Sequence, residues 1–275
     1  MNAHRTETLE ILTAPTAQPR PGMPPLLFIH GAYTAAWCWA EHFLPYFAQA
    51  GFNCQALSLS GHGASRRRDH LDSYSVDDYL NDVAEVAALL PVPPVLIGHS
   101  MGGFVVQKYL EHHPAAAAVL ICSVPPQGLA ASAFGMLFSR PNLFVDLNGL
   151  MSGGHVALSS LQEALFAQPV SMDDLGRYVR LAQPESHRAI WDMMLLNLPN
   201  IQRVIEHLPR QREDLRVMGA ELDLIIPTSL VEMTARSYGV NAKLYPGMGH
   251  GLMLERDWKI VAQDLIDWLG ERFVG

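Results

Sequence analysis

The sequence predicts an α/β fold with a mostly parallel central sheet, because short apolar runs alternate with stretches of helical periodicity along most of its 275 residues. The apolar runs are continuous rather than alternating, which is typical of strands buried on both faces of a parallel sheet. Hydrophobic residues make up 49% of the chain, enough for a sizeable core. We therefore expect one large domain, or one domain that carries an insertion.

The first 126 residues supply most of the expected elements. Prolines crowd residues 14–25, which we expect to form a loop. Ser75 precedes an acidic first turn and is a candidate helix cap. We expect strands at 7–12, 26–29, 52–59, 95–97 and 117–122, and helices at 37–50, 77–90 and 101–112.

Residues 127–200 interrupt this alternation. They are rich in Met, Leu and Phe, have the pattern of short helices and contain no clear strand. We interpret them as a helical lid inserted into a core formed by residues 1–126 and 201–275. The regular pattern resumes with a helix at 201–208, strands at 215–220 and 242–245, and a final amphipathic helix at 257–273.

Charge and cysteine content narrow the class of protein. The formal net charge of −8 argues against a nucleic-acid partner, which requires a basic face. Cys38, Cys54 and Cys122 are widely spaced and give neither a disulfide framework nor a metal-binding pattern. The first residues lack an apolar signal core, and no run approaches the roughly 18 apolar residues of a membrane helix. We expect a cytoplasmic protein with a small-molecule substrate, no cofactor, no metal and no membrane span; its oligomeric state stays open.

The most informative segment is Gly-His-Ser-Met-Gly over residues 98–102. It follows a buried strand and opens a helix, and its Gly-x-Ser-x-Gly pattern is that of a sharp strand-to-helix turn that exposes a serine hydroxyl. The peptide dipoles at the start of the helix favour negative charge there. Ser100 is therefore the candidate nucleophile.

A serine hydroxyl needs a base, and the base needs an acid that orients it. Ligands of such sheets lie beyond the carboxyl ends of the strands, so the partners should follow later strands. His250 follows the strand expected at 242–245 and is flanked by glycines, and Asp223 follows the strand expected at 215–220. Their chain order, Ser, Asp, His, is the one that accompanies this type of turn.

Rival residues fit these roles less well. His99 adjoins the serine but should point elsewhere on the turn, and we expect it to be structural. We expect His62, between two glycines, to be a turn residue rather than a base. Glu221 is the other candidate acid, but it lies closer to its strand than Asp223 and has less freedom to reach the base.

Together these residues resemble the α/β-hydrolase family, and the resemblance covers the whole chain apart from the lid. The stretch over residues 30–39 is similar to the branch that holds plant methylesterases and hydroxynitrile lyases, and to many bacterial esterases. The resemblance implies a serine hydrolase that passes through an acyl-enzyme. The segments that carry it, in the order of the family, are His30-Gly31, residues 61–65, residues 98–103, residues 223–227 and Gly249-His250.

The family pattern also bears on neighbouring positions. Dehalogenases and most epoxide hydrolases of this fold use an aspartate where this chain has Ser100, and the related hydroxynitrile lyases carry a lysine where it has Gly251, so these chemistries are disfavoured. The backbone N–H of Met101, directly after the nucleophile, is an expected oxyanion donor. The family pattern places the second donor at Ala32.

We therefore expect a carboxylic-ester hydrolase acting on a small, largely apolar ester. Hydrolysis of a carbon–carbon bond, a lactone or an amide by the same triad is the alternative, followed by a cofactor-free lyase and a non-catalytic binding protein. The lid side chains either line an acyl pocket or pack the lid onto the core, and the sequence leaves both open. The candidates are Phe134, Met136, Leu137, Phe138, Met193 and Met194.

Overall fold

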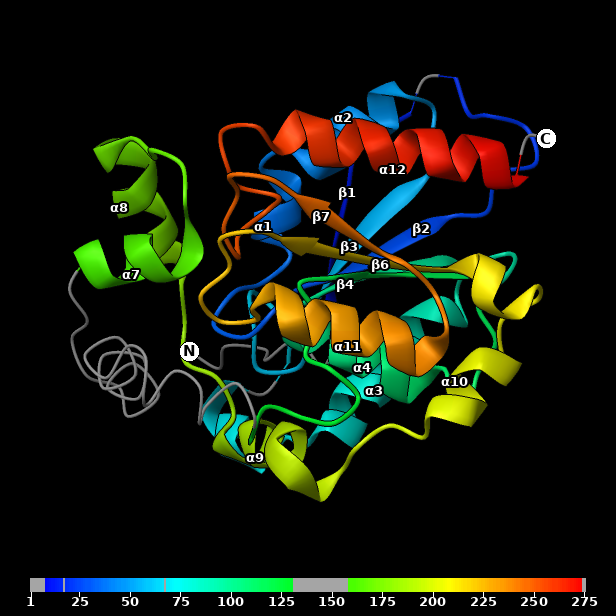
Figure 1. Cartoon of the computed structure of the whole chain (residues 1–275), viewed down its shortest axis with the longest axis horizontal. Helices are drawn as coiled ribbons and strands as arrows, with labels where there is room; N and C mark the ends of the chain where they lie inside the picture. Colours follow the sequence, from blue (N-terminus) through cyan, green and yellow to red (C-terminus); the bar gives the residue numbers. More distant parts are fainter. Residues whose placement is uncertain (1–7, 17, 67, 131–157, 274–275) are drawn as a thin grey trace, which may run out of the picture.

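The computed structural model describes residues 8–16, 18–66, 68–130 and 158–273. Its centre is a seven-stranded sheet with the strand order β1-β3-β2-β4-β5-β6-β7 (Figure 1). β1 is antiparallel to β3, and every other neighbouring pair is parallel. The strands are β1 (Glu10–Thr13), β2 (Leu26–Ile29), β3 (Cys54–Ser58), β4 (Val95–His99), β5 (Ala117–Ile121), β6 (Leu215–Ala220) and β7 (Ala242–Tyr245).

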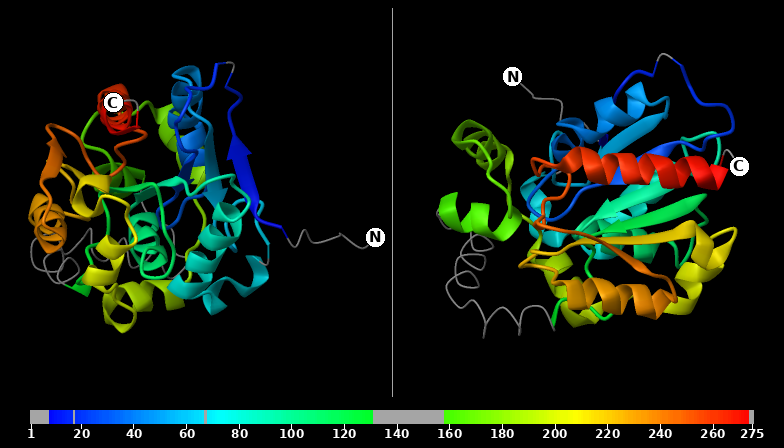
Figure 2. Two further views of the ribbon diagram at one scale, coloured as in Figure 1. Left: turned by 90° about the vertical axis from the view of Figure 1, so that its right-hand side faces the viewer. Right: turned by 45° about the horizontal axis from the view of Figure 1, so that its top comes forward.

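Helices cover both faces of this sheet (Figures 1 and 2). Before β6 they are α1 (Trp37–Ala40), α2 (Phe43–Gln49), α3 (Val76–Ala87), α4 (Met101–Tyr109), α7 (Leu158–Leu165), α8 (Met172–Leu181), α9 (His187–Trp191) and α10 (Ile201–Glu206). After β6 come α11 (Thr228–Tyr238) and α12 (Trp258–Phe273). The shorter turns are the 3₁₀-helices η1 (Arg68–Ser73) and η3 (Gln211–Asp214) and the π-helical turn η2 (Asp192–Leu196). None of the helices within the described ranges combines the length and the apolar character that a membrane crossing requires.

Two apolar cores form because successive strand residues point to opposite faces of the sheet. Leu26 and Phe28 of β2 are buried in the cluster that includes α2 and α12, whereas Leu27 and Ile29 are buried in the cluster that includes α3, α4 and α11. Burial on both faces explains why these strands are continuous apolar runs in the sequence. The α/β fold with a mostly parallel sheet is thus confirmed.

The helix expected over residues 37–50 is wrong as a single element, since it is divided into α1 and α2. Pro45 is the third residue of α2, where a helix has no intrahelical donor to lose. In one continuous helix, Pro45 would have to replace a donor to the carbonyl of Glu41 and would clash with it. The proline therefore dictates a new helix start at Phe43.

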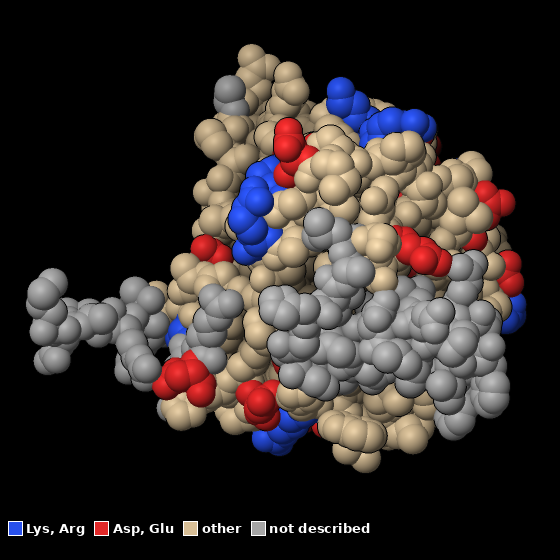
Figure 3. Space-filling view, turned by 90° about the vertical axis from the view of Figure 1, so that its left-hand side faces the viewer, with Lys and Arg blue, Asp and Glu red and all other residues tan. Residues whose placement is uncertain are grey.

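The described part of the expected lid, residues 158–200, contains helices and turns and no strand. α7 and α8 lie beyond the carboxyl ends of the strands (Figures 1 and 2). α9 lies instead beside the start of α3 and contacts η1. On the face that α7 and α8 share with the strand ends, charged side chains stand singly or in small groups among uncharged ones (Figure 3).

Candidate active site

Ser100 occupies a strained turn between β4 and α4. Its backbone angles are φ 51° and ψ −115°, in a region that residues with a side chain rarely adopt. The turn is possible because Gly98 and Gly102 have no Cβ, for which the surrounding backbone leaves no room. A Cβ on Gly98 would lie 2.4 Å from the carbonyl oxygen of Gly102, and one on Gly102 would lie 2.3 Å from that of Ile29. The hydroxyl is thereby presented at the carboxyl edge of the sheet, at the start of α4.

His250 and Asp223, from loops that follow β7 and β6, are hydrogen bonded. His250 Nδ1 lies 2.8 Å from Asp223 Oδ2, and both residues are buried. The other carboxylate oxygen, Oδ1, accepts the backbone N–H groups of Ile225 and Ile226, each at 2.8 Å. The carboxylate is therefore fixed in orientation, Nδ1 of the imidazole must donate, and Nε2 is left as the basic nitrogen.

Glu221, the rival acid, is exposed and accepts the backbone N–H of Gly247 at 2.9 Å. Its carboxylate thus bonds the turn after β7, whereas that of Asp223 bonds the imidazole of His250. The pairing of His250 with Asp223 is thus the one that the described structure contains.

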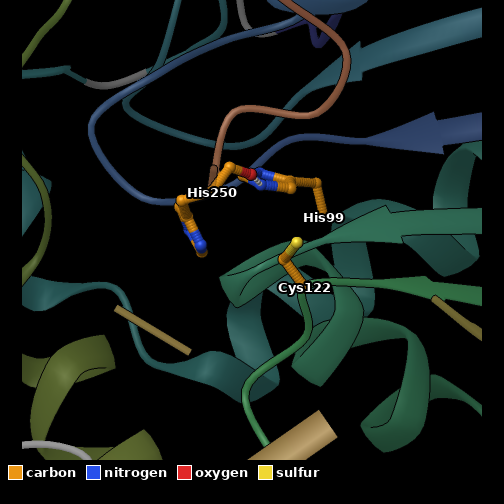
Figure 4. A group of neighbouring side chains, drawn as sticks. All are labelled: His99, Cys122 and His250. Atoms are coloured by element: carbon orange, nitrogen blue, oxygen red, sulfur yellow. Dashed lines mark hydrogen bonds between the residues drawn. The ribbon is translucent and has the colours of Figure 1, made fainter. Parts of the chain in front are cut away.

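His99, which directly precedes Ser100, contacts the loop of His250. Its Nε2 lies 2.9 Å from the backbone carbonyl oxygen of His250 and donates to it, and the two rings are 4.7 Å apart (Figure 4). The hydrogen bonds among the described residues do not include one between Ser100 Oγ and His250. In enzymes without substrate this contact is often longer than a hydrogen bond. His99 thus anchors the loop of the catalytic-base candidate to the serine turn.

Cys122, directly after β5, is buried beside Asp223 and His250. Its ligating atom and those of His99 and His250 lie within 4.8 Å of one another, the one group of metal-ligating type found in the described ranges (Figure 4). Burial, and then the charge and hydrogen bond of Asp223, raise the pKa of the Cys122 thiol well above its ordinary value. A protonated thiol is a poor metal ligand. We therefore interpret Cys122 as a hydrogen-bond donor to Asp223.

Two backbone N–H groups are available beside the serine. Neither Met101 N–H, at the start of α4, nor Ala32 N–H donates a hydrogen bond to any residue in the described part of the chain. The loop that holds Ala32 lies against the serine turn, since a Cβ on Gly31 would be 3.1 Å from Ser100 Cβ and 2.8 Å from His99 Nδ1. This arrangement suits a pair of donors to a developing oxyanion.

Sequence reasoning missed Glu255, which braces the loop of His250. The Glu255 side chain is fully buried and its carboxylate accepts the backbone N–H groups of Gly249 (2.7 Å), Ala167 (2.7 Å) and Gln168 (3.2 Å). Burial raises the pKa of its carboxyl above the ordinary value. Its only signal in the sequence is an acid directly after the short apolar run 252–254. The loop that carries His250 is thereby joined to the segment between α7 and α8.

The expected pocket residues divide into two groups. Phe134, Met136, Leu137 and Phe138 lie outside the described residues. Met193 and Met194 belong to η2; Met193 is buried in the same apolar cluster as Met101 and Phe104, and Met194 is half-buried. Met193 therefore packs its turn against the α4 side of the core.

Comparison with known proteins places this geometry in a family. The model of the alpha/beta hydrolase family matches residues 26–264. A non-heme haloperoxidase of Rhodococcus erythropolis is 26% identical over 253 residues (83% of this chain and 86% of that protein), and a monoacylglycerol lipase of Mycolicibacterium smegmatis is 28% identical over 246 residues (83% and 82%). The solved esterase of Exiguobacterium antarcticum shares the fold, with a TM-score of 0.73 at 17% identity and 95% of each chain covered. The chain belongs to the α/β-hydrolase family.

Proposed function

We propose that this α/β hydrolase cleaves a small, largely apolar carboxylic ester through an acyl-enzyme. The observation that carries the proposal is the buried 2.8 Å hydrogen bond between Asp223 and His250, beside a serine held in a strained turn at a helix start. This is the acid–base pairing that a serine nucleophile requires. The esterase and lipase among the similar proteins support an ester as the substrate class.

In the first half of the reaction, Ser100 Oγ attacks the ester carbonyl carbon while its proton moves to His250 Nε2. Asp223 accepts the hydrogen bond of Nδ1–H and stabilises the imidazolium that forms. The carbonyl oxygen becomes an anion, which the N–H groups of Ala32 and Met101 stabilise. When the C–O bond to the alcohol breaks, the imidazolium gives its proton to the leaving oxygen, and the acyl group stays on Ser100.

In the second half, water replaces the alcohol. His250 Nε2 takes one proton from the water as its oxygen attacks the acyl carbon, and the same donors stabilise the second tetrahedral anion. The imidazolium then protonates Ser100 Oγ as the acyl bond breaks, so the acid is released and the enzyme returns to its starting state. No oxidant, metal or cofactor is needed to balance these steps.

We further propose that residues 127–200 act as the cap over this site and supply much of its apolar lining. Support comes from α7 and α8, which lie beyond the strand ends, and from Gly251 N–H, which donates to the carbonyl oxygen of Leu165 at 2.7 Å. The cap is therefore in direct contact with the loop that carries the base.

The test uses p-nitrophenyl esters of increasing acyl length together with a fluorophosphonate label. The wild-type protein should hydrolyse the short esters and lose activity in step with labelling of Ser100. Ser100→Ala should lower kcat by about 10⁴-fold or more and abolish labelling. Unchanged turnover in this variant, or labelling at another residue, would exclude the proposed nucleophile.

A further inference from the structure

A segment of the cap between α8 and α9 is hydrogen bonded to the loop of residues 31–34. Gln183 N–H donates to the carbonyl oxygen of Tyr33 at 3.0 Å, and its side-chain Nε2 donates to that of Thr34 at 3.3 Å. Its Oε1 accepts the N–H of Gly63 at 3.1 Å. One glutamine of the cap thus bridges two loops of the core, at 31–34 and 61–63.

Two residues further on, Glu185 inserts a carboxylate into the core. Its Oε2 lies 3.0 Å from His62 Nε2, and both side chains are 0% exposed. Its Oε1 accepts the hydroxyl of Tyr79 at 2.6 Å and the N–H of Ser186 at 2.8 Å. His62 Nδ1 lies 3.1 Å from the carbonyl oxygen of Ser60. Both ring nitrogens of His62 therefore face acceptor oxygens, an arrangement that favours the doubly protonated ring beside the buried Glu185 carboxylate.

His62 in turn lies against His30, with ring centroids 5.1 Å apart. His30 Nε2 accepts the backbone N–H of Leu59 at 3.0 Å, so a neutral His30 carries its proton on Nδ1 and donates to the carbonyl oxygen of Gly31 at 2.8 Å. Burial and the neighbouring charge of His62 lower the pKa of His30 to about 3, which keeps this ring neutral. The tautomer of His30 is therefore determined at neutral pH.

The carbonyl of Gly31 shares a peptide unit with the N–H of Ala32. Thr34 Oγ1 also donates to this carbonyl oxygen, at 2.9 Å. Since the peptide is planar and trans, fixing the direction of the Gly31 C=O with two donors fixes the Ala32 N–H in the opposite direction. The contacts that hold His30 and Thr34 thus set where the Ala32 N–H points.

We infer that Glu185 is a positioning residue: it holds His62 packed against His30, and His30 in turn aims the Ala32 N–H through the carbonyl of Gly31, so that the oxyanion hole is complete only when the cap segment 183–186 is seated. This inference rests on the proposed function, because it assigns the Ala32 N–H to the oxyanion. It adds a role for the His62 turn that the proposed triad does not use. A donor whose direction is loosened loses part of the roughly 10²–10³-fold that a complete oxyanion donor contributes to kcat.

The experiment compares Glu185→Ala with Glu41→Gln, a matched control. Glu41 also pairs across the cap and core, with Arg177 at 2.5 and 2.6 Å, but it lies on the α1 side and does not touch the oxyanion loop. For each variant, the concentration of active sites is titrated with a fluorophosphonate, and kcat, KM and the inhibition constant of an alkyl trifluoromethyl ketone are measured. That ketone forms a tetrahedral adduct with the serine and needs the same oxyanion donors.

Per titrated site, Glu185→Ala should lower kcat about tenfold or more with little change in KM, and it should raise the inhibition constant of the ketone by a similar factor. Glu41→Gln should leave kcat and the inhibition constant near the wild-type values. Gln183→Ala removes the side-chain bridge but no buried charge, so it should lower kcat and ketone affinity in the same direction by a smaller factor. This variant provides the test if Glu185→Ala does not fold. Wild-type kcat and ketone affinity per site in the folded Glu185 or Gln183 variant would overturn the inference and leave the proposed function intact. A wild-type protein without esterase activity would instead overturn the proposed function.

Discussion

Replacing Asp223 with asparagine should remove most of the activity by reversing the proton arrangement of His250. Asp223 Oδ1 accepts two backbone N–H groups, from Ile225 and Ile226, each at 2.8 Å. An asparagine must point its oxygen at these two donors, because its NH₂ group in that place would forfeit both bonds and face two donors. The NH₂ group then faces His250 Nδ1, which can accept only when its proton has moved to Nε2. A proton on Nε2 prevents the ring from taking the proton of Ser100.

The magnitude follows from these contacts. Turning the amide round would cost two hydrogen bonds at about 1–1.5 kcal/mol each, so the productive arrangement would form in roughly one molecule in 30 to 150. Asparagine also lacks the charge that stabilises the imidazolium, which adds about 2–3 kcal/mol. Together these effects predict a loss of about 10⁴-fold in kcat, or about 5.5 kcal/mol.

The assay is hydrolysis of p-nitrophenyl butyrate, with circular dichroism to verify folding. Glu221→Gln is the matched control, since Glu221 is an exposed carboxylate two residues away whose side chain accepts the N–H of Gly247 in the turn after β7. It should retain activity within about twofold. Retention of more than a tenth of wild-type kcat in Asp223→Asn, or an equal loss in the control, would refute the reasoning.

Three further predictions concern stability and the loop of the base. Glu255→Gln places an NH₂ donor against backbone N–H groups, so the free energy of unfolding, measured by chemical denaturation, should fall by about 1–3 kcal/mol. The kcat should also fall as the His250 loop loosens, and wild-type stability and kcat in this variant would contradict the bracing role. Ser75→Ala removes the capping box of α3 and should cost about 1 kcal/mol with kcat unchanged, measured by the same two methods. Burial opposes the charge of Glu185, but His62 together with the hydrogen bonds from Tyr79 and Ser186 outweighs burial, so the pKa of this carboxyl lies below its ordinary value of 4.5. The stability that the charged carboxylate contributes is therefore present above that pH and is lost on acidification. Glu185→Gln should make the unfolding free energy depend less on pH in this acidic range, and an unchanged pH dependence would count against the reasoning.

Local patterns in the sequence predicted the architecture well, because a parallel sheet leaves a strong signal in each strand. β6 and β7 begin and end at the predicted residues, and α3 starts directly after the predicted cap, Ser75. α11 was not predicted, although Pro227 precedes it and Gly239, in the left-handed region, ends it. The buried residues of α11, Val231, Thr234, Ala235 and Tyr238, also follow helical spacing, but Thr234 is polar and Ala235 is small, so their apolar stripe is inconspicuous in the sequence.

The candidate site was predicted as far as its side chains follow strand ends. Such residues need only the topology of the sheet to meet, and His250 and Asp223 do form a hydrogen bond. Glu185 and Glu255 were not predicted because their partners are backbone groups or residues distant in sequence, which leave no spacing to recognise. The roles of Ser100, Ala32 and Met101 stay predictions that the variants above test.

The bridge made by Gln183 has a consequence for engineering. Cap regions are attractive units for exchange between relatives, since a new cap would bring a new substrate preference. A transplant that replaced residues 127–200 as one block would also remove the contacts of residues 183–186 with Tyr33, Thr34 and His62. Chimeras of this enzyme should therefore keep residues 183–186 with the host, so that the grafted part alters selectivity without slowing the chemistry.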